Sequence, residues 1–126
     1  MVTFDGKPAA EDWYAVSLAE PTAVQRVVFT HGRNFHDGGW FDASGGKPRV
    51  QVRLSADGEW QTVGELGDYP ATTATANGGI KGGQKFTVGL APPVKVIAVR
   101  VVGKPASGSK PEQAFSSCGE LEAFAN

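Results

Sequence analysis

Residues 49–63 read RVQVRLSADGEWQTV, and this stretch decides the fold class. Val50, Val52 and Leu54 alternate with polar neighbours, which is the period-two pattern of a strand with one buried face. The turn Ala56-Asp57-Gly58 follows at once and leads into a second strand-like run. The stretch therefore predicts an antiparallel β-hairpin with one apolar face.

Similar runs recur between turn signals along the whole chain. Gly and Pro number 17 and 8 among the 126 residues, and no segment has a sustained helical period. These features exclude a helical bundle and predict an all-β fold, an antiparallel β-sandwich or barrel in a single domain over residues 1–126. The predicted strands are 12–18, 24–31, 49–55, 59–63, 85–90, 95–102 and 117–124.

The composition excludes several classes of function. The net charge of -1 argues against binding to a nucleic-acid backbone or to an anionic membrane. No apolar run approaches the ~18 residues of a membrane-spanning helix, and the N-terminus does not read as a signal peptide. We interpret Cys118, the single cysteine, as a small buried hydrophobic residue. The near-neutral charge and the absence of a heptad pattern or a long apolar strand edge predict a monomer.

The connections between the predicted strands indicate where a binding surface lies. Short and long connections alternate along the chain, and successive connections of an antiparallel meander alternate between its two ends. The long ones therefore emerge at one end, where ordered loops on a rigid scaffold build binding surfaces. The short connections are Glu20-Pro21-Thr22, Ala56-Asp57-Gly58 and Ala91-Pro92-Pro93, and the long ones are residues 32–48, 64–84 and 103–116.

Catalytic and transition-metal motifs are weak. Glu120 and Glu122 share a strand face, but paired glutamates are common on solvated faces and give little support for glycoside hydrolysis. His31 and His36 have no tight metal-binding spacing, and we interpret them as part of a polar loop. Calcium is a better candidate, because Asp5 and Glu120 both reach the long-loop end; otherwise they are unrelated surface carboxylates.

Aromatic residues gather in the long loops. Phe35, Trp40 and Phe41 lie in the first, Tyr69 in the second and Phe115 at the end of the third. Rings beside His, Asn and Arg side chains suit a sugar, whose C–H groups lie on the ring while its hydroxyls take polar partners. The alternative is that rings plug the core, which we favour for Phe35 and Phe41. Trp40 fits either role, and we expect Phe115 to be exposed. For Trp13 and Trp60, core or sheet-surface packing is expected.

Several short motifs occur in a recognisable order. They are Phe-Asp-Gly, Asp-Trp-Tyr, Arg-Val-Val-Phe, Phe-x-Asp-Gly-Gly-Trp-Phe, Val-Gln-Val-Arg, a Gly-x-Trp hairpin and a terminal Gly-Glu-Leu-Glu-Ala-Phe. In this order they resemble the discoidin-like (coagulation factor 5/8 type C) domains, and are most similar to bacterial family 32 carbohydrate-binding modules. The chain departs from that pattern in two places: the strand expected before the first motif is short or missing, and Glu11 and Asp12 stand where a hydroxyl residue is usual.

The resemblance implies a jelly-roll sandwich of the galactose-binding-domain type. It further implies a structural calcium held by Asp5 and Glu120, and a sugar site at one end with Phe115 as its aromatic platform. The other carbohydrate-binding candidates are Trp40, His36, Asn34, Arg33 and Tyr69. The implied function is a non-catalytic module that tethers a secreted bacterial enzyme to its polysaccharide or glycan. The alternative on the same fold is a protein-interaction or adhesion module, and the identity of the sugar stays open.

Overall fold

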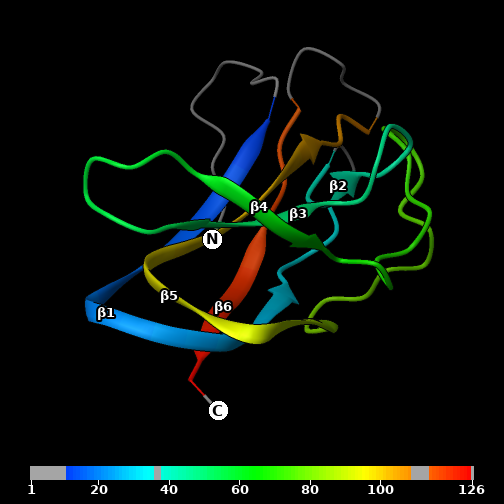
Figure 1. The fold of residues 1–126 in the computed structure, drawn as a ribbon. Coiled ribbons are helices and arrows are strands. Elements are labelled where there is room, and N and C mark those ends of the chain that lie inside the picture. Colours follow the sequence, from blue (N-terminus) through cyan, green and yellow to red (C-terminus); the bar gives the residue numbers. More distant parts are fainter. Residues whose placement is uncertain (1–10, 36–37, 109–113, 126) are drawn as a thin grey trace.

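The computed structural model describes residues 11–35, 38–108 and 114–125, and every regular element within them is a β-strand (Figure 1). The strands pair antiparallel in the order β4-β3-β5-β1-β6, and β2 pairs with β5. The predicted all-β, antiparallel fold is confirmed. The strands are β1 (Asp12–His31), β2 (Phe41–Asp42), β3 (Arg49–Arg53), β4 (Gln61–Glu65), β5 (Lys85–Pro105) and β6 (Cys118–Phe124).

Two long strands replace four of the predicted short ones. β1 and β5 pair from Asp12 opposite Gly103 to Thr30 opposite Lys85, with register shifts after Ser17 and after Val24. The segments Glu20-Pro21-Thr22 and Ala91-Pro92-Pro93 therefore lie inside the strands and do not reverse the chain. Proline lacks an N–H donor and is tolerated at bulges as well as in turns, which explains why these residues resembled reversals. Figure 1 shows both strands bending at the same place.

The bend brings the two halves of each long strand around one core. The rings of Tyr14 and Phe29, both on β1, have centroids 6.4 Å apart. A straight strand would separate residues fifteen positions apart by about 50 Å. The fully buried core also contains apolar side chains from β3, β5 and the loops, namely Val50, Val52, Leu66, Ile80, Phe86, Val99 and Val101. Cys118 is 1% exposed, which confirms its interpretation as a buried residue, and burial raises the pKa of its thiol to about 11.

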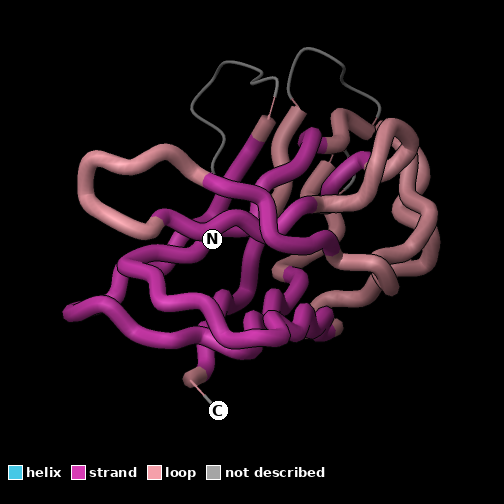
Figure 2. Tube along the Cα trace, viewed as in Figure 1, coloured by secondary structure: helices cyan, strands magenta, loops and turns pink. Residues whose placement is uncertain are grey.

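The three long connections meet at one end, as expected. Trp40 Nε1 donates to the carbonyl of Thr73 at 2.8 Å, and Ser107 N donates to the carbonyl of Ala74 at 3.1 Å. Gly83 N donates to the carbonyl of His31 at 2.9 Å. Figure 2 shows the described parts of the first two connections on the right of the molecule, with the β3–β4 connection on the left. The reason differs from the expected alternation of short and long reversals, because two of the three short connections do not reverse the chain. The bend in β1 and β5 brings the long connections to one end instead.

A buried polar cluster ties the start of β1 to the segment before β6. The Asp12 carboxylate accepts hydrogen bonds from Ser116 N at 2.9 Å and Ser116 Oγ at 2.8 Å. The Tyr14 hydroxyl lies 2.9 Å from the same Oγ. Because Ser116 follows Phe115 directly, the cluster also fixes the backbone that carries a predicted site residue.

We expect Asp12→Ala to lower the free energy of unfolding by about 1–3 kcal/mol, because the Ser116 N–H would stay buried without its acceptor. Urea denaturation measures the loss. Asp57→Ala is the control, since Asp57 lies in the exposed β3–β4 turn, and its effect should stay within about 0.5 kcal/mol. Equal losses in the two variants would contradict the assignment of Asp12.

Candidate functional site

Two phenylalanine rings form an aromatic pair at the loop end. Phe35 is 38% exposed and Phe115 is half-buried, and their ring centroids lie 5.5 Å apart at an interplanar angle of 58°. The exposed guanidinium of Arg33 lies 5.8 Å from the centre of the Phe35 ring. The predicted exposure of Phe115 is met in part, whereas the expectation that Phe35 plugs the core is corrected. Rings and a cation together offer an apolar face beside hydrogen-bond donors.

Backbone hydrogen bonds and two glycines hold the aromatic pair. Phe35 N donates to the carbonyl of Gly38 at 2.8 Å, and Gly39 N donates to the carbonyl of Phe115 at 3.0 Å. Gly38 and Gly39 have φ of 142° and 111°, which side chains rarely adopt. A Cβ on Gly38 would also lie 2.9 Å from the Phe115 ring, and one on Gly39 would lie 2.3 Å from the Arg33 carbonyl oxygen. The Gly-Gly pair therefore lets the loop close against the rings.

The Ser117 hydroxyl fastens this loop to the start of β6. Its Oγ accepts a hydrogen bond from Arg33 N at 2.8 Å and lies 2.6 Å from the carbonyl oxygen of Gly39. Ser117 is 2% exposed, so these bonds are shielded from water. The backbone on both sides of Phe35 is thus fixed by one buried side chain.

Asn34 holds the loops together and has little left to offer a ligand. Its Nδ2 donates to the carbonyl of Ile80 at 2.7 Å, so its Oδ1 accepts from His31 Nε2, also at 2.7 Å. Both ends of the carboxamide are therefore used within the protein. Arg33 is the predicted polar residue whose side chain is exposed, and His36 lies outside the described residues.

Trp40 and Tyr69 belong to the core, which corrects their expected role as sugar-binding residues. They are 3% and 1% exposed. The Tyr69 hydroxyl accepts a hydrogen bond from Phe41 N at 2.8 Å, and burial raises the pKa of that hydroxyl well above its ordinary value. Phe41 is buried as expected. Residues 64–84 cover this end of the core, so neither Trp40 nor Tyr69 presents a ring face to a ligand.

Of the two predicted calcium ligands, the structure describes Glu120. Glu120 is exposed near the start of β6, opposite Thr30 on β1, and forms no ion pair among the described residues. Asp5 lies outside the described residues. Within residues 11–35, 38–108 and 114–125, no group of three His, Cys, Asp or Glu side chains is placed to hold a metal ion.

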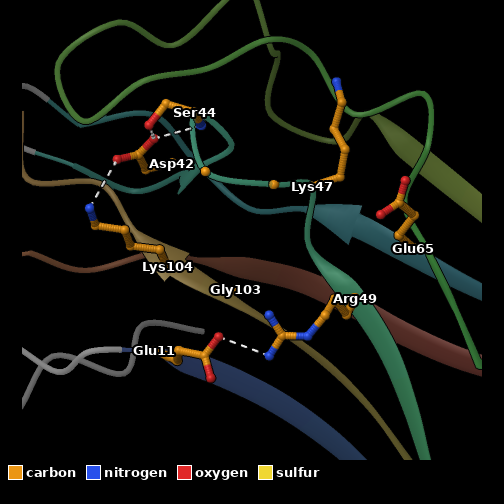
Figure 3. Close-up of a pocket in the computed structure, with 10 residues that line it drawn as sticks. Glu11, Asp42, Ser44, Lys47, Arg49, Glu65, Gly103 and Lys104 are labelled. Carbon is orange, nitrogen blue, oxygen red and sulfur yellow. Dashed lines mark hydrogen bonds and ion pairs between the residues drawn. The ribbon is translucent and has the colours of Figure 1, made fainter. Parts of the chain in front are cut away.

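A charged pocket of about 390 Å³ lies between the β2–β3 connection and the end of β5 (Figure 3). Asp42 accepts hydrogen bonds from Ser44 N and Oγ at 2.9 and 2.6 Å, and Lys104 Nζ lies 3.7 Å from its other oxygen. Arg49 forms an ion pair of 2.8 Å with Glu11. Four of the six charged residues that line the pocket are thus paired, and no aromatic ring is among the described residues that line it. It therefore lacks the apolar face that a sugar needs.

Sequence reasoning missed the organisation of the outer sheet face. Trp13 is 52% exposed on β1, and the Arg100 guanidinium on β5 lies 5.7 Å from its ring and 4.5 Å from that of Trp60. The signal was present in the alternation around Val50 and Val52, which turns Gln51 and its polar neighbours outward. The alternation does not predict the strand order. In the structure, β1 and β3 lie on the two sides of β5, which brings these side chains together.

Solved structures identify the fold. No protein-family model matches the chain, and no curated protein matches it. A family 32 carbohydrate-binding module from a family 31 glycoside hydrolase of Clostridium perfringens is similar, with TM-score 0.57, 13% identity, and coverage of 96% of this chain and 80% of that one. An F5/8 type C domain from Bacteroides fragilis has TM-score 0.54 and 20% identity, with 97% and 70% covered. This chain has the discoidin-like fold.

A third solved structure broadens the comparison. Chitosan-binding module 1 of a chitosanase/glucanase from Paenibacillus sp. IK-5 has TM-score 0.53 and 20% identity, with 98% of this chain and 75% of that chain covered. All three likenesses extend over nearly the whole chain, so the predicted resemblance to discoidin-like domains is confirmed at the level of the fold. Among the described residues, no helix has the length and hydropathy needed to cross a bilayer.

We expect Trp40→Ala to lower the free energy of unfolding by about 3–5 kcal/mol, because it empties a core site and leaves the Thr73 carbonyl without its donor. Trp13→Ala is the matched control and should cost far less, since half of that side chain is already in water. Denaturant titration of both variants distinguishes them. Equal stability of Trp40→Ala and the parent would show that Trp40 is not a core residue.

A second prediction concerns pH. Burial lowers the pKa of His31 below its ordinary value, against the raising effect of its hydrogen bond to Asn34. The imidazole is fully buried, and its Nδ1 has no hydrogen-bond partner among the described residues. The unfolded chain therefore takes up a proton more readily than the folded one. The contribution of His31 to the free energy of unfolding is therefore full above about pH 6.5, and it is lost as the pH falls below that value.

The prediction is tested in a His36→Gln background, so that His31 is the remaining histidine. The free energy of unfolding should fall between about pH 7.5 and pH 5, and adding His31→Gln should make that fall smaller. Identical pH profiles for the single and double variants would refute a neutral, buried His31.

Proposed function

We propose that this chain is a non-catalytic carbohydrate-binding module whose platform is the aromatic pair of Phe35 and Phe115. The observation that carries the proposal is that this pair, with Phe35 exposed and Phe115 half-buried, lies where the three long loops meet. Support comes from the fold, which the chain shares with carbohydrate-binding modules of known structure. Arg33 lies beside the rings, and we retain His36 as a further candidate.

The geometry of the pair suits a shallow sugar site. Pyranose C–H groups pack on an aromatic face, and two rings inclined at 58° give a bent platform. The Arg33 guanidinium can donate hydrogen bonds to sugar hydroxyls at the rim. A single shallow site of this kind is expected to bind with about -4 to -8 kcal/mol, in the millimolar to micromolar range.

Such an affinity is useful when the module is joined to an enzyme. Tethering raises the effective concentration of a catalytic domain near its polymer, so weak binding becomes productive. We therefore propose that the chain acts within a larger secreted bacterial protein that acts on glycans, and as a monomeric module. Sedimentation showing a stable dimer at micromolar concentration would contradict the monomer.

The carbohydrate site is tested with a glycan array followed by titration of the best neutral glycan. Phe115→Ala and Phe35→Ala should each weaken binding by ~1 kcal/mol or more, because each removes ring area from the sugar. Phe124→Ala is the matched control: it also carries an arginine over its ring, Arg26 at 4.3 Å, but lies at the far end of β6. Parent-like binding by both site variants would refute the platform.

The competing function is protein interaction or adhesion on the same fold. The array separates it from the proposal, because an adhesion module gives no defined sugar hits. A blank array with folded, monomeric protein would overturn the carbohydrate-binding role.

We also propose that calcium stabilises the fold through Glu120 and Asp5. Calcium prefers several oxygen ligands, and an ion shared by these two residues would join the ends of the chain. Calcium at ~100 times its dissociation constant should add about 2.7 kcal/mol to the free energy of unfolding. A chelator should lower Tm of the parent but not of Glu120→Gln. A parent Tm that is the same with calcium and with chelator would contradict the site.

A further inference from the structure

The outer face of the sheet carries a second aromatic and cationic surface, which we call the Trp13–Trp60 face. Arg100 lies between its two indoles, with its Cζ 5.7 Å from the Trp13 ring and 4.5 Å from the Trp60 ring. Arg53 lies 5.0 Å from the Trp60 ring. The face is thus an alternating row of rings and guanidinium groups drawn from β1, β5, β3 and the residue before β4.

The strand register places these side chains on one side of the sheet. On β5, Val102 lies opposite both Trp13 on β1 and Arg49 on β3. Two positions away on β5, Arg100 lies opposite Gln51 on β3, so its side chain is on the same side of the sheet. Neighbouring residues on the same strands, Tyr14, Val50 and Val52, are buried in the core. Because side chains alternate along a strand, Trp13, Gln51 and Arg100 point away from that core.

Two guanidinium groups on this face, those of Arg100 and Arg53, have N–H groups without a hydrogen-bond acceptor among the described residues. Arg100 Nε donates to Gln51 Oε1 at 2.8 Å, which orients the group, and its terminal nitrogens have no hydrogen-bond partner among the described residues. Arg53 forms no hydrogen bond or ion pair within the described residues, and its Nε is buried without a partner. Arg49 is different, because Glu11 pairs with it at 2.8 Å. Arg53 and Arg100 thus form no ion pair among the described residues, although the Glu11 carboxylate that pairs with Arg49 also acts electrostatically on Arg100.

We propose that the Trp13–Trp60 face binds an acidic polysaccharide through the carboxylates of its uronic acid residues. This inference rests on the proposed carbohydrate-binding role but uses a surface distinct from the Phe35–Phe115 pair. The sugar ring stacks on the exposed indole of Trp13, and a carboxylate accepts hydrogen bonds from the terminal nitrogens of Arg100.

Three features favour this ligand. A guanidinium already held by Gln51 and by two rings is preorganised, so it loses little side-chain entropy when it binds a planar carboxylate through two N–H groups. The half-exposed indole offers an apolar face, which an acidic sugar uses and an acidic peptide backbone does not. Finally, the row of side chains extends over β1, β5, β3 and the residue before β4, so it can contact more than one sugar of a chain.

The test titrates the folded protein with oligogalacturonate and with the same oligosaccharide after methyl esterification of its carboxylates. The free acid should bind at least about ten-fold more tightly, and its affinity should fall as salt is added. Arg100→Gln and Trp13→Ala should each weaken binding at least about five-fold, and Arg100→Lys should weaken it less than Arg100→Gln. The control is Arg26→Gln, which removes an arginine stacked on a ring elsewhere, and it should leave affinity unchanged.

Several results would overturn the inference. Equal affinity for the acid and its methyl ester, or equal losses in Arg26→Gln and Arg100→Gln, would remove the role of the Arg100 charge. Competition by polyglutamate as effective as that by oligogalacturonate would identify an acidic protein as the partner, and tighter binding of a sulfated oligosaccharide would identify sulfate as the anion.

The Phe115→Ala variant separates this inference from the proposed function. It should keep parent affinity for oligogalacturonate while losing the neutral glycan. If uronate binding is absent and neutral-glycan binding still depends on Phe115, the Trp13–Trp60 face fails and the proposed function stands. Uronate binding that depends on Phe115 and not on Trp13 would assign the acidic sugar to the loop end and refute this face.

Discussion

The pairing of β1 with β5 through a shared bend is the constraint on which the rest of the structure depends. Because both strands bend together, their hydrogen bonds continue on either side and the two halves enclose one core. Tyr14 and Phe29 meet only for this reason. The bend also returns both ends of β1 to the same end of the molecule, where the three long connections pack together.

At that end, buried hydroxyl and carboxylate groups decide which rings are exposed. Ser116 is held by Asp12, and Ser117 holds the backbone of Arg33, so the segments that carry Phe115 and Phe35 are both fixed. Trp40 faces the opposite way and is covered by residues 64–84. The loop end therefore divides its aromatic residues into an inner group that stabilises the core and an outer pair that is open to a ligand.

The sequence predicts the strands well because alternation reports directly on burial, as at Val50 and Val52. It misplaces the chain reversals at Pro21 and Pro92, since a proline marks a bulge and a turn with the same local signal. Nor does it distinguish Phe35 from Tyr69. Both are loop aromatics, and which of them is buried depends on contacts between distant segments, such as Ser117 with Arg33 and Phe41 with Tyr69. The link between Asp12 and Ser116 spans 104 positions, which local patterns cannot reveal.

A loop end for neutral sugars and a sheet face for acidic ones would let one small sandwich hold a polymer at two points. The central claim is that the loop end is a sugar-binding surface. Amide chemical shifts of the ¹⁵N-labelled chain during titration with its best neutral glycan test this most directly. We expect the largest changes at Arg33, Phe35, Gly39 and Phe115. Unmoved amides at these positions, with the largest changes near Val63 and Leu90 beside the bend of β5, would contradict the claim.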